Sequence, residues 1–144
     1  MMSPQPSILV VDDEQGFHDL FQYLLLPLGY MVHSARGGQE AAERLRERGY
    51  DVIFLDIHIP KTNSFALLKH IQESYPEERV VLMNSSPHAP IGLDEALHSS
   101  GTAGCLHKPF GLEQLLEVLE NLVPAPEWTK SAPALTAQKP GAGW

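Results

Sequence analysis

Acidic residues follow two short apolar runs of this chain, and a lysine follows a third. The runs are residues 8–11, followed by Asp12 and Asp13; residues 52–55, followed by Asp56; and residues 104–107, followed by Lys108. Neighbouring parallel strands end at the same edge of their sheet, and open α/β sheets bind ligands at that edge. If the three runs are such strands, three carboxylates and one ammonium group meet there.

A cluster of this kind can support phosphoryl transfer. Three carboxylates held close together repel one another, and a divalent cation such as Mg²⁺ relieves that repulsion when oxygen ligands bind it. The carboxylate of Asp56 could then attack phosphorus as a nucleophile. The Lys108 ammonium would pair with the phosphoryl group, or with Asp56 before transfer. A serine hydroxyl after the fourth strand could hydrogen-bond the phosphoryl oxygen and move inward, which would make a switch.

Each signal has a simpler interpretation when it is taken alone. An Asp-Asp pair after a strand is often only a helix N-cap with a favourable dipole interaction. A single aspartate at a strand end is more often a turn residue than a nucleophile. The specific feature is the combination of Asp-Asp, Asp and Lys-Pro-Phe after the first, third and fifth strands.

Short apolar runs alternate with stretches of helical spacing along residues 1–123, which we expect to form one domain. Strict alternation of five strands with five helices indicates a parallel sheet covered on both faces. Residues 124–144 are rich in Pro and Ala, show no periodicity, and are expected to form a tail or linker. The predicted strands are residues 7–11, 30–35, 51–55, 79–83 and 105–107, and the predicted helices are residues 15–28, 39–48, a third from an N-cap at Ser64, 93–99 and 112–122.

Composition narrows the function classes. The chain has 144 residues, of which 43% are hydrophobic and 19% charged, as expected of a soluble globular domain. No apolar stretch approaches the roughly 20 residues of a membrane span. The formal net charge of −8 argues against nucleic-acid binding by this segment, so protein partners are favoured. The single cysteine, Cys105, cannot form an internal disulfide and fits a reducing cytoplasm.

Residues 7–123 resemble the receiver domain of two-component response regulators. The matching segments are Ile8-Leu9-Val10-Val11-Asp12-Asp13-Glu14, Asp51-Val52-Ile53-Phe54-Leu55-Asp56 with Pro60, and His107-Lys108-Pro109-Phe110. The resemblance implies the α/β, flavodoxin-like, doubly wound fold, with five parallel strands in the order 2-1-3-4-5. It implies that Asp56 accepts a phosphoryl group from a phosphohistidine of a sensor histidine kinase or histidine phosphotransfer protein. It further implies Mg²⁺ held by Asp12, Asp13, Asp56 and the backbone carbonyl of His58, with Lys108 as the essential lysine.

The chain departs from the family pattern in the loop after the acceptor and at its switch positions. Ile59 precedes Pro60 where Met is usual, and Asn63-Ser64 stands where Asp-Gly is usual. Counting forward from Asp56 favours Asn84 as the switch residue, and counting back from Lys108 favours Ser86. The family pattern of a small residue directly after the switch residue favours Ser85. We predict Ser85. Cys105 occupies the fifth-strand position of a switching Tyr, so another route would carry the output.

Three functional hypotheses follow. The first is a phosphorylation-dependent signalling module that catalyses only its own phosphorylation and dephosphorylation. Its output would pass through a downstream protein or a fused output domain, and the resemblance allows homodimers. The second is a degenerate receiver that binds partners without phosphorylation. The third is a phosphatase with an aspartyl nucleophile, which is disfavoured because His58 stands where such enzymes carry a second acid.

Overall fold

The computed structural model describes residues 5–84 and 101–123, which build a five-stranded sheet. The strand order is β2-β1-β3-β4-β5, and each neighbouring pair is parallel. Both findings confirm the predicted fold. The strands are β1 (Ser7–Val11), β2 (Met31–Ala35), β3 (Val52–Asp56), β4 (Arg79–Asn84) and β5 (Gly104–His107).

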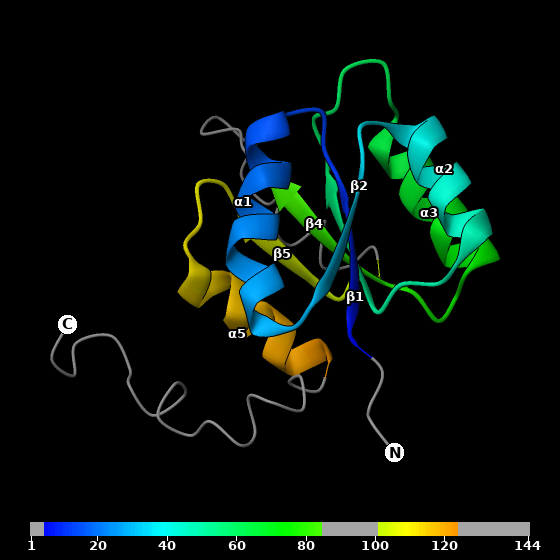
Figure 1. Cartoon of the computed structure of the whole chain (residues 1–144). Helices are drawn as coiled ribbons and strands as arrows, with labels where there is room; N and C mark the ends of the chain where they lie inside the picture. The colour runs from blue at the N-terminus through cyan, green and yellow to red at the C-terminus, as the bar shows by residue number, and fades with distance from the viewer. Residues whose placement is uncertain (1–4, 85–100, 124–144) are drawn as a thin grey trace, which may run out of the picture.

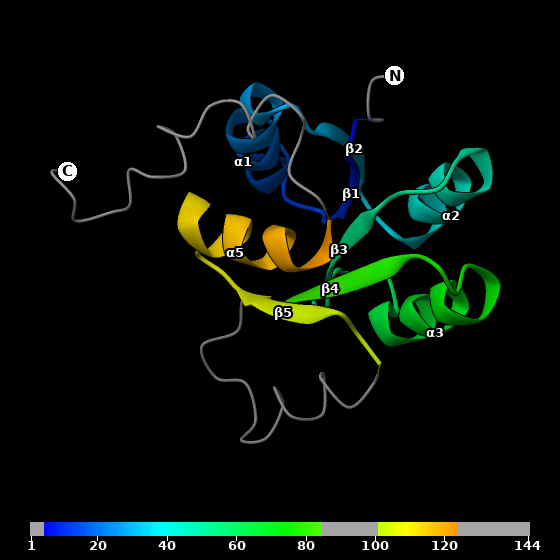
Figure 2. The ribbon, with the colours of Figure 1, turned by 90° about the horizontal axis from the view of Figure 1, so that it is seen from below.

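Helices cover both faces of this sheet, as Figures 1 and 2 show. One face carries α1 (Gln15–Leu25) and α5 (Leu112–Leu122), and the other carries α2 (Gly38–Glu47) and α3 (Ser64–Ser74). The predicted helix near residues 93–99 lies outside the described residues. Among the helices that are described, none combines the length and the apolar character that a membrane span requires.

Two apolar clusters, one on each face, hold the layers together. Along β1, Ile8 and Val10 belong to the cluster under α1 and α5, whereas Leu9 and Val11 belong to the cluster under α2 and α3. All four side chains are fully buried. Burial on both faces explains why this central strand reads as an uninterrupted apolar run rather than an alternating one.

Most predicted boundaries lie within one residue of the observed ones, and two of the differences have a clear physical cause. The first helix ends at Leu25 rather than at residue 28, and a short 3-10 turn (Leu26–Leu28) follows it. Gly29 closes that turn with a φ of 93°, a left-handed conformation that glycine adopts readily.

The second of these differences is the N-cap of α3, which is Asn63 rather than Ser64. The Asn63 side chain accepts a hydrogen bond from the Ala66 N–H at 3.0 Å. Ser64 is instead the first helical residue. Its hydroxyl donates to the backbone carbonyl of Asp56 at 2.7 Å, which ties the start of α3 to the end of β3.

Candidate functional site

The register of the sheet brings Asp12 and Asp56 side by side. Val11 of β1 pairs with Leu55 of β3, so the next residue on each strand lies at the carboxyl edge beside the other. The two carboxylates come from residues that are 0% and 1% exposed. Two buried carboxylates side by side require a nearby cation, because burying an uncompensated charge is costly.

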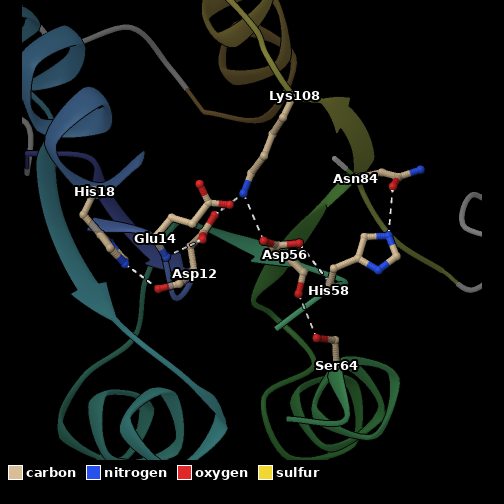
Figure 3. A network of polar contacts seen from close by, with 8 residues as sticks. All are labelled: Asp12, Glu14, His18, Asp56, His58, Ser64, Asn84 and Lys108. Carbon is tan, nitrogen blue, oxygen red and sulfur yellow. Dashed lines mark hydrogen bonds and ion pairs between the residues drawn. The ribbon is translucent and has the colours of Figure 1, made fainter. Parts of the chain in front are cut away.

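Lys108 supplies that cation. It follows β5, and its backbone N–H donates to the carbonyl of Asn84 at 2.9 Å, which fixes where its side chain starts. Its Nζ forms an ion pair with Asp56 Oδ2 at 2.9 Å and a second ion pair with Asp12 Oδ2 (Figure 3). The Lys108 side chain is only 3% exposed. Burial alone would lower the pKa of Lys108, but the hydrogen bonds and charges of the two aspartates outweigh burial and raise it.

Backbone groups fix the other oxygen of each carboxylate. The Glu14 N–H donates to Asp12 Oδ1, and the His58 N–H donates to Asp56 Oδ1, both at 2.9 Å. Aspartates commonly accept from the backbone two residues onward. Each carboxylate therefore has one oxygen held by its own loop and one oxygen held by Lys108.

Buried side chains also brace the backbone at the two strand ends. His18 of α1 is 1% exposed, and its Nε2 lies 2.6 Å from the carbonyl oxygen of Asp12. Since a carbonyl only accepts, Nε2 is the protonated ring nitrogen. Ser64 plays the same part for the Asp56 carbonyl. Figure 3 shows both contacts.

The acidic cluster is larger than the sequence indicated. Ligand oxygens of Asp12, Asp13, Glu14 and Asp56 all lie within 4.8 Å of one another. Asp13 and Glu14 are exposed, so they face solvent at the mouth of the site. Glu14 was not predicted as a site residue, although its position directly after Asp12-Asp13 in the sequence could have indicated it. A set of hard carboxylate oxygens with solvent access has the chemistry that Mg²⁺ prefers.

His58 and Asn84 close the other side of the site. Asn84 ends β4, is 2% exposed, and its Oδ1 lies 3.1 Å from His58 Nε2 (Figure 3). The structure thus brings Asn84, one of the three candidate switch positions, next to the residue that follows Asp56 by two. Ser85 and Ser86, the other candidates, lie outside the described residues.

The response regulator receiver domain family matches residues 8–120 of the chain. The transcriptional regulatory protein ZraR of Escherichia coli (strain K12) is 32% identical over 135 residues, which is 93% of this chain and 30% of that protein. The chain thus spans under a third of the length of this relative.

Solved structures agree with these sequence relationships. A response regulator from Thermotoga maritima superposes with a TM-score of 0.75 at 25% identity, covering 85% of this chain and all of that one. The T. maritima response regulator protein TrrA, solved in complex with Mg²⁺-BeF, has a TM-score of 0.71 at 26% identity, over 82% of this chain and 99% of that one. Since the family match extends from the first strand almost to the end of the last helix, this chain belongs to the response regulator receiver domain family.

Proposed function

We propose that the chain is a phosphorylation-dependent signalling module in which Asp56 accepts a phosphoryl group. The observation that carries the proposal is the Lys108 ammonium, which is buried and bonded to both Asp12 and Asp56 at the carboxyl edge of the sheet. A buried cation between two acids stabilises a fold poorly compared with apolar packing. A reaction that needs a cation at this edge of the sheet accounts for its presence there.

In the proposed reaction an oxygen of Asp56 attacks the phosphorus of a phosphohistidine. A new O–P bond forms, the N–P bond breaks, and the electron pair of that bond returns to the histidine of the donor protein. The His58 N–H holds the Asp56 carboxylate in one orientation for this attack. The Lys108 ammonium, 2.9 Å from Asp56, is placed to follow the charge onto the transferred phosphoryl group.

Mg²⁺ is part of the proposal. Asp12, Asp13 and Asp56 would hold it, with the His58 carbonyl, and Glu14 offers a further carboxylate. Bound there, Mg²⁺ supplies positive charge that neutralises the acids and the phosphoryl oxygens. The Mg²⁺-BeF complex of TrrA supports this assignment by family relationship.

The remaining elements of the proposal concern signalling. Ser85 is proposed to bond the phosphoryl group through its hydroxyl. A sensor histidine kinase or a histidine phosphotransfer protein is the proposed donor, and a downstream protein or fused output domain the proposed receiver of the signal, with homodimers as one form of output. The match covers only 30% of ZraR, which supports the proposal of a fused output domain. The single cysteine supports a cytoplasmic location, where disulfides are rare.

The test is an intact-mass measurement after incubation with a small phosphodonor and Mg²⁺. The wild type should gain one phosphoryl group, Asp56→Asn should gain none, and Asp19→Asn, an exposed carboxylate of α1, should behave as wild type. Folded wild type without an adduct would refute the proposal and favour the degenerate receiver that binds partners without phosphorylation. An equal adduct on Asp56→Asn would show that another residue is the acceptor.

A further inference from the structure

The ring of Phe17 covers the ammonium group of Lys108. Nζ lies 3.9 Å from the ring centroid, well within the distance at which a cation is attracted to an aromatic face. The same nitrogen is bonded to Asp12 and Asp56, so two carboxylates and one aromatic face surround it. A lysine usually extends its ammonium group into solvent, and the Phe17 ring prevents this on its side of Lys108.

A row of aromatic rings holds Phe17 in place. Its ring centroid is 5.9 Å from that of Phe110, which follows Lys108 by two residues. Phe110 is 5.5 Å from Phe21, and Phe21 is 5.0 Å from Phe54 of β3. The row thus extends from the ammonium to a strand residue two positions before Asp56, and Phe17 packs against this buried cluster as a partly buried side chain.

Core packing alone does not account for this placement. A leucine at position 17 could fill much of the same space against Phe110, but only an aromatic ring presents a negative face to the ammonium. The attraction is stronger when the cation is removed from water, as the 3% exposure of the Lys108 side chain indicates.

The ring also differs chemically from the other two partners of the ammonium. Carboxylates compete with an incoming phosphoryl group for the positive charge of Lys108. The Phe17 ring carries no net charge and can remain in contact while Lys108 exchanges an Asp56 oxygen for a phosphoryl oxygen. It therefore holds the ammonium beside Asp56 while the Asp56 contact is being lost and the phosphoryl contact is being formed, which is when Lys108 depends most on its remaining partners.

We infer that Phe17 is a positioning residue for Lys108, and that the electron density of its ring sets how fast Asp56 is phosphorylated. This inference rests on the proposed function, which it deepens by assigning a residue that acts through the essential lysine. Phe17 acts through Lys108 and is not assigned a contact with the phosphoryl group or the metal ion.

The first arm of the test replaces Phe17 by phenylalanines that carry one, two or three ring fluorines. Fluorine withdraws density from the ring face while hardly changing its volume. The initial rate of phosphorylation by acetyl phosphate at saturating Mg²⁺ should fall stepwise, to about fivefold below wild type with three fluorines. The same series at Phe65, which is 49% exposed on α3, should leave the rate unchanged. A rate that does not depend on fluorination at Phe17 would overturn the inference.

The second arm requires no phosphorylation. Urea unfolding is measured for the Phe17 series in Mg²⁺-free buffer, with lysine or methionine at position 108. The folded-to-unfolded ratio should fall by about fivefold across the series with lysine and stay constant with Lys108→Met. Equal slopes in both backgrounds would overturn the inference. If wild type takes up no phosphoryl group, the proposed function fails separately, and this arm still decides whether Phe17 holds Lys108.

Discussion

Replacing Lys108 by methionine should destabilise the fold in a way that Mg²⁺ reverses. Methionine keeps most of the side-chain volume but removes the charge that compensates Asp12 and Asp56. At the 2.9 Å distance to Asp56 and an effective dielectric constant of about 20, that one attraction amounts to roughly 6 kcal/mol. Part of it is offset, because the variant no longer buries an ammonium group. The net loss should be about 3–5 kcal/mol, as found when one partner of a buried ion pair is removed.

Thermal unfolding followed by far-UV circular dichroism measures this loss. For a domain of this size, about 4 °C of melting temperature corresponds to 1 kcal/mol, so Lys108→Met should melt about 12–20 °C below wild type in Mg²⁺-free buffer. Lys69→Met, which removes an exposed lysine of α3, is the matched control and should shift the melting temperature little.

Adding Mg²⁺ separates this explanation from a simple packing defect. A ligand present at 100 times its dissociation constant stabilises the folded state by about 2.7 kcal/mol. The gain should be larger in Lys108→Met than in wild type, because the variant has no ammonium group competing for the carboxylates. Asp13→Asn in the same background should lose most of the gain. A variant as stable as wild type without Mg²⁺, or equal Mg²⁺ gains in both proteins, would refute the reasoning.

Three further changes test the supports of the sheet and its site. Burial and the nearby Arg48 lower the pKa of His33 below 6.5, so the unfolded chain binds the proton more readily and wild type should lose stability as pH falls below 6.5. Urea unfolding between pH 7.5 and 5 should show a smaller loss of stability in His33→Gln. Equal losses in the two proteins would contradict the assignment of this pH dependence to His33. His18→Leu removes the donor to the Asp12 carbonyl and should lower the free energy of unfolding by about 1–3 kcal/mol. It should also weaken Mg²⁺ binding, as measured by calorimetry, and His18→Gln should recover part of the stability and part of the Mg²⁺ affinity. Ser64→Ala should cost about 1–2 kcal/mol in thermal unfolding because the backbone carbonyl of the last β3 residue loses its donor, whereas the exposed Ser74→Ala should be neutral.

The sheet and the acid–lysine cluster were predictable because they depend on short-range patterns. Apolar runs of strand length, separated by helical spacing, determine a parallel sheet, and parallel strands place the residues that follow them at one edge. Asp12, Asp56 and Lys108 were therefore found from their positions directly after strands. The structure adds the register, in which Val11 pairs with Leu55, and this register makes the two aspartates direct neighbours.

The supporting residues could not be predicted in the same way. Asn63 and Ser64 are both good N-cap residues, and the sequence does not show which one begins the helix. The choice follows from the buried Asp56 carbonyl, which takes the Ser64 hydroxyl and leaves the cap to Asn63. Phe17 has ordinary helical spacing for a core residue. Its ring packs against Phe110 and faces the Lys108 ammonium, and a one-dimensional pattern contains neither contact.

The arrangement of the site implies that the internal cation and a bound metal ion are coupled. Lys108 holds the Oδ2 atoms of both buried aspartates, so an ion that binds the same carboxylates must share them or displace the ammonium. Linkage then requires that a tighter hold on Lys108 weakens the metal ion, and that the metal ion loosens Lys108 by the same factor. The Phe17 ring counters that loosening, since it attracts the ammonium without using a carboxylate oxygen. A lysine freed from one carboxylate but still held by the ring remains beside Asp56, where a phosphoryl group would need it.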